Sequence, residues 1–100
     1  KEDLLARYGG EEFIALLPGA TQSAASTLAE RIRRKLASME LHAAGNPVRI
    51  TVSIGVVTER GQSLPSLEVL LARADEALYA AKAEGRDRVV ISGMPLAIAA

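Results

Sequence analysis

The stretch Arg7-Tyr8-Gly9-Gly10-Glu11-Glu12-Phe13 stands between two apolar runs near the start of this 100-residue chain. Residues 3–8 can run extended, and residues 13–17 are typical of a buried strand that ends at Pro18-Gly19. Two-residue turns of β-hairpins need positive φ, which glycine adopts without steric cost. The pattern therefore predicts a β-hairpin whose turn places two carboxylates beside bare glycine backbone.

Such a turn suits a polyphosphate that carries a divalent cation. Glycine lets the backbone approach the phosphates, and Mg²⁺ usually takes one or two protein carboxylates together with phosphate oxygens. From spacing alone, however, an ordinary hairpin with two solvated acids explains such a match more often. Both interpretations stay open at this point.

Composition excludes several other classes of protein. The 12 basic and 12 acidic residues cancel, so no net field draws the chain to nucleic acid or to a membrane. The absence of cysteine excludes disulfides and thiolate metal sites and fits a reducing compartment. No signal-peptide pattern opens the chain, and its apolar runs are shorter than the ~20 residues of a membrane span. We expect a cytoplasmic chain that is a piece of a longer protein.

The rest of the chain alternates helical and strand patterns. Leu28, Ile32, Leu36 and Met39 form one apolar stripe, which predicts a helix over residues 21–42 with its N-cap at Thr21 or Ser23. Residues 48–56 alternate in period two and predict one strand. Ser66 caps a second helix, Gly85 ends it, and residues 88–91 form a last short strand. The buried face of the second helix is predicted from Leu67, Leu70, Leu71, Ala74, Leu78 and Ala81.

This order of elements is of the α+β class, in one domain over residues 1–91 followed by a tail at 92–100. Three stretches resemble the GGDEF family of bacterial diguanylate cyclases. They are the hairpin, in the variant with Glu at the third motif position, the segment Val52-Ser53-Ile54-Gly55-Val56, and residues 73–87, which read RADEALYAAKAEGRD. The resemblance implies the later part of a ferredoxin-like antiparallel sheet, similar to the palm of nucleotide cyclases and polymerases. The family's first strand and helices have no counterpart in this sequence.

The resemblance also implies a function in bacterial signalling. Members of the family are transferases that condense two GTP molecules into cyclic di-GMP and pyrophosphate with Mg²⁺ or Mn²⁺, in a homodimer whose half-sites face each other. Glu11 would bind the metal and is the candidate base for the 3′-hydroxyl, and Glu12 would support the metal and phosphate network. Gly9 and Gly10 would let the nucleotide lie against the turn.

Lys82 and Arg86 correspond to the family's phosphate contacts, and an ammonium and a guanidinium are suited to phosphate oxygens. Taken alone, cations at a helix C-terminus are also explained by the helix dipole. Asp3 and Arg31 match parts of the family's product-inhibition site, although Arg31 is equally well explained as a solvated residue beside Glu30. The inhibitory arginine that precedes the Asp would lie before Lys1.

Other candidates are weaker. Helix faces and core positions explain Asp75 and Tyr79 adequately, and His42 has no second metal ligand at suitable spacing. The family's other metal carboxylate and its guanine contacts belong to the segment without a counterpart here, so we expect this chain alone to be inactive. A non-catalytic nucleotide-binding or interaction module is the alternative function. Without the central strand, residues 13–17 and 48–56 would each lack a neighbour, which predicts an edge-paired or strand-exchanged oligomer.

Overall fold

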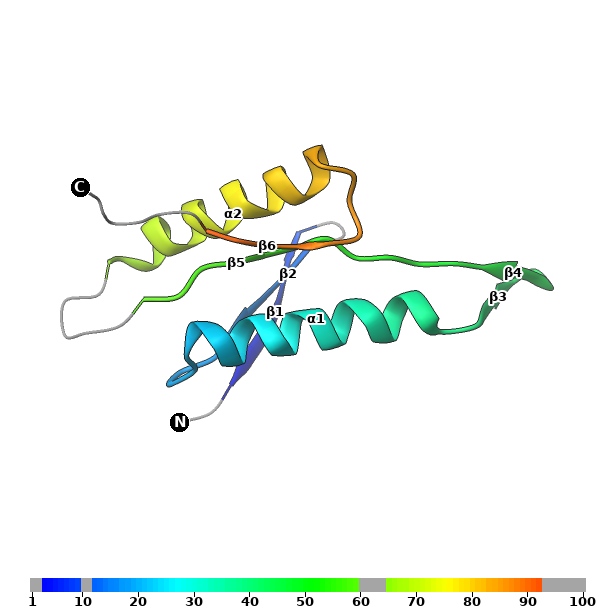
Figure 1. Cartoon of the computed structure of the whole chain (residues 1–100), viewed down its shortest axis with the longest axis horizontal. Coiled ribbons are helices and arrows are strands. Elements are labelled where there is room, and N and C mark those ends of the chain that lie inside the picture. Colours follow the sequence, from blue (N-terminus) through cyan, green and yellow to red (C-terminus); the bar gives the residue numbers. More distant parts are fainter. Residues whose placement is uncertain (1–2, 10–11, 60–64, 93–100) are drawn as a thin grey trace.

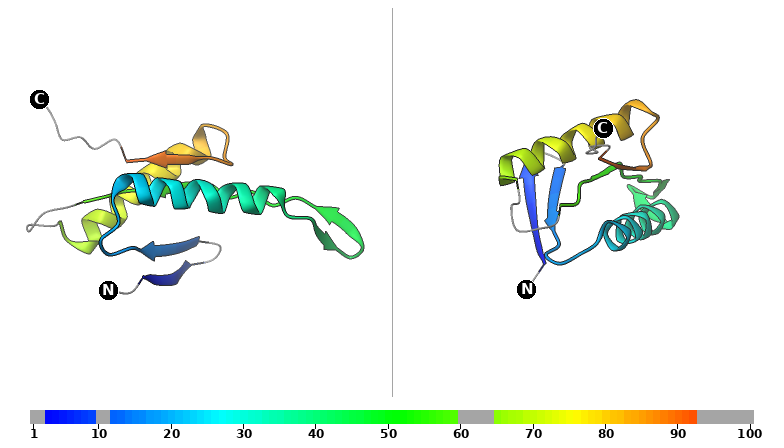
Figure 2. Two further views of the ribbon diagram at one scale, coloured as in Figure 1. Left: turned by 60° about the horizontal axis from the view of Figure 1, so that its bottom comes forward. Right: turned by 60° about the vertical axis from the view of Figure 1, so that its left-hand side comes forward.

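The computed structural model describes residues 3–9, 12–59 and 65–92. Its elements, in chain order, are β1 (Leu4–Gly9), β2 (Glu12–Leu16), α1 (Gln22–Ser38), β3 (Leu41–Ala43), β4 (Asn46–Val48), β5 (Ile54–Val56), α2 (Leu67–Ala83) and β6 (Val89–Ile91). Figure 1 shows β5 and β6 between the two helices, and Figure 2 shows the β1–β2 hairpin beside them. The mixture confirms the predicted α+β class. The expected tail lies outside the described residues from residue 93 onward, as do residues 60–64 of the connection before α2.

The predicted first hairpin is present. β1 and β2 are antiparallel, with Leu4 opposite Leu16 and Arg7 opposite Phe13, and the register shifts between Arg7 and Gly9. A register shift of this kind is typical of a bulge next to a turn. The turn residues Gly10 and Glu11 themselves lie outside the described residues.

Helix α1 is shorter than the sequence pattern predicts. Thr21 is its N-cap, and the Oγ1 of Thr21 accepts a hydrogen bond of 3.0 Å from the amide of Ala24. The helix ends at Ser38 rather than at His42, because Met39 is extended (φ −75°, ψ 140°). His42 lies instead in β3, where it is exposed.

The structure contains a second hairpin that the sequence did not predict. β3 pairs with β4 in antiparallel register, with Leu41 opposite Val48 and Ala43 opposite Asn46. Ala44 and Gly45 form its tight turn with φ of 54° and 83°, and two successive residues with positive φ are characteristic of a two-residue hairpin turn. In Figure 1 this hairpin projects beyond the end of α1.

The predicted continuous strand over residues 48–56 is therefore wrong in extent. β4 ends at Val48, residues 49–53 belong to no strand, and β5 begins only at Ile54. The two ends of this stretch pair with different partners, β3 and β6, so one continuous ladder does not form. β5 and β6 are parallel, unlike the expected antiparallel arrangement, with Ile54 opposite Val89 and Val56 opposite Ile91.

Small residues allow α2 to lie directly on β5. Ala77 and Ala81 of α2 are buried, as is Val56 of β5. A Cβ placed on Gly55 would lie 2.4 Å from the amide nitrogen of Leu78 and 2.5 Å from the carbonyl oxygen of Ala74. Of the predicted buried face of α2, Ala81 is fully buried and Leu67 is 53% exposed, so the prediction is wrong for Leu67. The other four predicted residues are half-buried: Leu70, Leu71, Ala74 and Leu78.

Two of the sheets, β1–β2 and β5–β6, have an open edge. Within residues 3–9, 12–59 and 65–92, β2 is hydrogen-bonded only to β1, and β5 only to β6. No helix in the described ranges has the length and apolar character needed to cross a membrane.

Candidate functional site

The structure brings Glu12 and Lys82 together, two residues that the sequence analysis assigned to one site. Glu12 begins β2, next to the predicted turn, and Gly9 is its partner across the ladder. Lys82 lies in the last turn of α2. Its Nζ is 3.5 Å from Oε2 of Glu12, and both side chains are partly exposed. A carboxylate and an ammonium from distant segments therefore face the same solvent-accessible region.

Beside this ion pair is a hollow of about 200 Å³. The residues that line it come from the start of β2 and from one side of α2: Glu12, Asp75, Leu78, Tyr79 and Lys82. Asp75, Tyr79 and Lys82 follow the spacing i, i+4, i+7, which places them on one helix face. That spacing was the available signal that Asp75 and Tyr79 belong near the site, and the sequence analysis attributed both to ordinary helix packing. Tyr79 is 75% exposed, so core packing does not explain it here.

Mg²⁺ is compatible with the donors at this hollow. Glu12 and Asp75 provide hard carboxylate oxygens, and Mg²⁺ commonly combines one or two such groups with water and phosphate oxygens. No group of three or more metal-binding His, Asp or Glu side chains occurs among the residues that the structure describes. Glu11, the principal predicted metal ligand, and Gly10 lie outside those residues.

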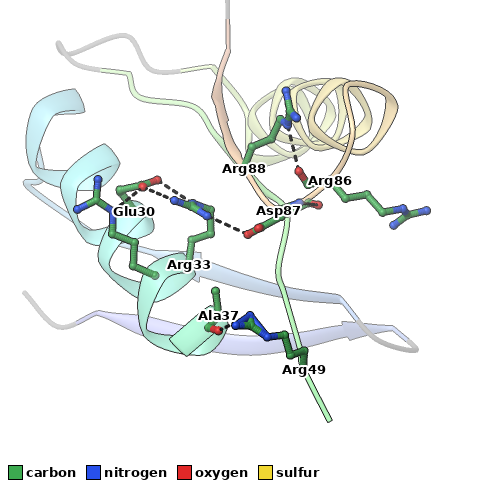
Figure 3. A network of polar contacts seen from close by, with 9 residues as sticks. Glu30, Arg33, Ala37, Arg49, Arg86, Asp87 and Arg88 are labelled. Carbon is green, nitrogen blue, oxygen red and sulfur yellow. Dashed lines mark hydrogen bonds and ion pairs between the residues drawn. The ribbon is translucent and has the colours of Figure 1, made fainter. Parts of the chain in front are cut away.

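Arg86 lies in the turn that follows α2. Gly85 has φ of 124°, as predicted for the residue that ends the helix, and Arg86 and Asp87 continue with φ of 64° and 48°. The amide of Arg86 donates a hydrogen bond of 2.9 Å to the carbonyl oxygen of Ala81, which satisfies one of the last carbonyls of the helix. The Arg86 side chain is exposed, and Figure 3 shows it extending away from the neighbouring polar network.

That network joins α1 to the same turn, and sequence reasoning missed it. Nη1 of Arg33 donates to Oδ1 of Asp87 at 2.9 Å, while Nε and Nη2 of Arg33 donate to the two carboxylate oxygens of Glu30 at 3.0 and 2.6 Å. The hydrogen bonds from Arg33, with a further one from Arg34, lower the pKa of Glu30 from 4.5 to about 2 although burial opposes the shift. The hydrogen bonds from Glu30 and then Asp87 raise the pKa of Arg33 above its ordinary value. Glu30 and Arg33 are therefore both charged at neutral pH.

Asp3 and Arg31, the predicted inhibitory-site residues, are both exposed. Asp3 precedes β1, and Arg31 lies on α1. The carboxylate of Glu30 is occupied by Arg33 and Arg34, so pairing with Glu30 does not account for Arg31.

Comparison with known proteins shows the family of this chain. The profile of the family described as "Diguanylate cyclase, GGDEF domain" matches residues 1–88. Diguanylate cyclase DgcP of Pseudomonas aeruginosa is 42% identical over 90 residues, which are 90% of this chain and 13% of that protein. Diguanylate cyclase A of Treponema denticola is 43% identical over 90 residues, 90% of this chain and 24% of that protein. The chain thus spans less than a quarter of the length of these two relatives.

Solved structures show the same fold. The GGDEF domain of DgcB from Caulobacter crescentus, in complex with c-di-GMP, has a TM-score of 0.82 and 36% identity, with coverage of 92% of this chain and 54% of that chain. The active GGEEF domain of a diguanylate cyclase from Vibrio cholerae has a TM-score of 0.81 and 31% identity, with coverage of 95% and 59%. These matches confirm the expected partial fold of the nucleotide-cyclase type. The chain belongs to the GGDEF family of diguanylate cyclase domains.

Proposed function

We propose that this chain supplies the phosphate- and metal-binding half of a diguanylate cyclase site. The observation that carries the proposal is the Glu12–Lys82 pair beside the hollow on α2. A phosphate group that enters there meets the Lys82 ammonium, which is held near the turn by the Glu12 carboxylate. Arg86, exposed in the turn after α2, supplies a two-pronged donor for further phosphate oxygens.

The reaction is a nucleotidyl transfer that occurs twice and forms two phosphodiester bonds. The 3′-oxygen of one GTP bonds to the α-phosphorus of the other, the bond between the α-phosphorus and the bridging oxygen breaks, and pyrophosphate leaves. We assign the acceptance of the 3′-hydroxyl proton to Glu11, and the approach of the nucleotide backbone to Gly9 and Gly10. Mg²⁺ or Mn²⁺, when bound through Glu11 and Glu12, supplies positive charge that neutralises the phosphates.

The proposed product sets requirements for assembly. Cyclic di-GMP contains two nucleotides, so two domains that hold one GTP each must face one another. We assign Asp3 and Arg31 to a separate site that binds the product. We place the reaction in the cytoplasm, where GTP is available and where a chain without cysteine is at no disadvantage. Because this chain covers little more than half of the solved family domains, we propose activity for a protein that contains the whole domain, and none for residues 1–100 alone.

The test is the conversion of GTP to cyclic di-GMP by a protein that includes the rest of the family domain. Purified protein with GTP and Mg²⁺ should form cyclic di-GMP and pyrophosphate, which chromatography resolves. Glu11→Gln should abolish the product, whereas Glu76→Gln, at an exposed position on α2, should leave it unchanged. A folded protein that binds cyclic di-GMP without any turnover of GTP would instead indicate a receptor module.

A further inference from the structure

The turn between α2 and β6 has a backbone conformation that its own residues do not favour. Arg86 and Asp87 have φ of 64° and 48°, and both carry a Cβ. The left-handed region is sterically unfavourable for Arg86 and is tolerated better by Asp87, and two successive residues with a Cβ in this region are uncommon. Conformations of this kind persist where surrounding contacts impose them.

The turn has an internal hydrogen bond of 3.0 Å from Nε of Arg88 to the carbonyl oxygen of Arg86, and three further contacts come from other segments. The amide of Arg86 donates to the carbonyl oxygen of Ala81 in α2 at 2.9 Å. The amide of Asp87 donates to Oγ of Ser53, just before β5, at 3.2 Å. The carboxylate of Asp87 accepts from Nη1 of Arg33 in α1 at 2.9 Å. Of these three, the contact to Arg33 is the one between charged side chains, and it ties the turn to the other helix.

Arg33 is itself held in place by Glu30. Nε and Nη2 of the guanidinium donate to the two oxygens of Glu30, and Nη1 donates to Asp87. Two-pronged pairing fixes the plane of a guanidinium as well as its position. The Arg33 side chain is only 20% exposed, so it has little freedom to adopt another conformation.

We propose that Arg33 is a positioning residue for phosphate binding: by holding Asp87, it maintains the left-handed turn that presents Arg86. The inference rests on the phosphate role proposed above for Arg86. Neither Arg33 nor Arg86 is among the residues that line the hollow at Glu12 and Lys82. Arg33 therefore acts on the part of a phosphate ligand that extends from the hollow to the turn, where Arg86 meets it.

Arg34 offers a matched control. Nε of Arg34 also pairs with Glu30, at 2.9 Å, but the Arg34 side chain is 74% exposed. Among the described hydrogen bonds, none joins Arg34 to the turn. Removal of Arg34 therefore deletes one charge and one ion pair with Glu30 without releasing Asp87. The conservative variant Arg33→Lys keeps the charge but lacks the planar donor set that serves Glu30 and Asp87 together.

The experiment combines a ligand titration with a measurement of the free protein. In the protein that contains the whole domain, calorimetric titration with GTP and Ca²⁺, which limits turnover, gives affinity. NMR backbone chemical shifts and amide exchange report the conformation of residues 86 and 87. Arg33→Ala and Asp87→Ala should each weaken GTP binding about tenfold, since small displacements of a binding group have effects of this size or larger. The double variant should lose no more than either single variant, because both remove the same contact.

The controls separate positioning from general destabilisation. Arg34→Ala should leave GTP affinity and the NMR signals of the turn unchanged. Arg33→Lys should bind GTP more tightly than Arg33→Ala but less tightly than the unsubstituted protein. Thermal unfolding identifies any variant that is not folded; if Arg33→Ala is among them, Arg33→Lys and Asp87→Asn carry the test.

The outcomes are distinguishable. Loss of affinity together with altered signals at residues 86 and 87 supports the inference. Unchanged GTP affinity in folded Arg33 and Asp87 variants overturns it while the proposed function stands. Failure of the unsubstituted protein to bind GTP overturns the proposed function and the inference together, and then the NMR comparison still shows whether Arg33 holds the turn.

Discussion

The Nζ of Lys82, in the last turn of α2, lies 3.5 Å from Oε2 of Glu12, the first residue of β2. This pair joins the hairpin of the signature motif to the helix whose following turn carries Arg86, the other phosphate-binding candidate. Because the two side chains are 36% and 43% exposed, solvent weakens their attraction. The pair therefore matters more for where the ammonium sits than for the stability of the fold.

A double-mutant cycle tests whether the Glu12–Lys82 pair contributes little to the stability of the fold. We expect Glu12→Gln and Lys82→Met to show a coupling free energy of about 0.2–1 kcal/mol in urea unfolding, as for other partly exposed ion pairs. The coupling should decrease when salt is raised to about 1 M, where the Debye length is about 3 Å. Lys82→Met should weaken the affinity for GTP by a larger factor than it changes the equilibrium constant of unfolding. A coupling free energy well above about 2 kcal/mol would contradict the proposal that Lys82 serves to bind a ligand rather than to stabilise the fold.

Gly55→Ala should strongly destabilise the chain. The added Cβ would approach backbone atoms of Leu78 and Ala74 to 2.4 and 2.5 Å, and a backbone cannot move aside as a side chain can. We expect a loss of about 2–3 kcal/mol in urea unfolding, in the upper part of the range for overpacked cores. Gly19→Ala is the control: Gly19 has φ of +84°, but no atom lies within 4 Å of the place its new methyl group would take, so only backbone strain of about 1 kcal/mol applies. Equal losses in the two variants would show that β5 and α2 are less closely packed than these distances indicate.

The contribution of Glu30 to stability should depend on pH. Its pKa is about 2 in the folded chain and 4.5 ordinarily, so the folded state favours the charged carboxylate. This contribution is complete above about pH 5 and is lost as the pH falls from 4.5 toward 2. Urea unfolding should show that Glu30→Gln is less stable than the unsubstituted chain at neutral pH and that the difference disappears near pH 2. Glu76→Gln, exposed on α2, should not show this convergence, and a pH-independent effect of Glu30→Gln would refute the expectation.

The open edges of β2 and β5 predict self-association of the 100-residue chain. Unpaired strand edges are templates for pairing with another chain, and a charged residue on the strand opposes such pairing. Light scattering during size-exclusion chromatography should show a dimer or larger oligomer that dissociates on dilution. Phe13→Lys, on β2, should weaken the association, whereas Val69→Lys, at an exposed apolar position of α2, should not. A monomer at every concentration would exclude edge pairing.

Local chemistry made much of this fold predictable. The glycine pair and its flanking apolar runs predict the β1–β2 hairpin. Ser66 was predicted as the N-cap of α2, and its Oγ accepts a hydrogen bond of 3.2 Å from the amide of Val69. These features depend on residues within a few positions of one another, where sequence and geometry are closely related.

Two features were outside the reach of such reasoning. The β3–β4 hairpin turns at Ala44, and alanine is a helix former that carries no signal for φ of 54°. The Arg33–Asp87 contact joins residues far apart in the chain, and on sequence alone Arg33 resembles any charged residue on the solvated side of α1. Its spacing of three from Glu30 could have indicated the local pair, but not the distant one.

The contact of Gly55 with the backbone of α2 also affects how the site adapts to a ligand. Helix α2 cannot move closer to β5. Its side chains at the hollow therefore form a rigid side of it: Asp75, Tyr79 and Lys82. Glu12 belongs to a hairpin that is not hydrogen-bonded to β5 in the described part of the chain. The side of the hollow that Glu12 forms can therefore move more easily. We therefore expect ligands of different bulk to displace the hairpin, while Asp75, Tyr79 and Lys82 keep constant positions relative to β5.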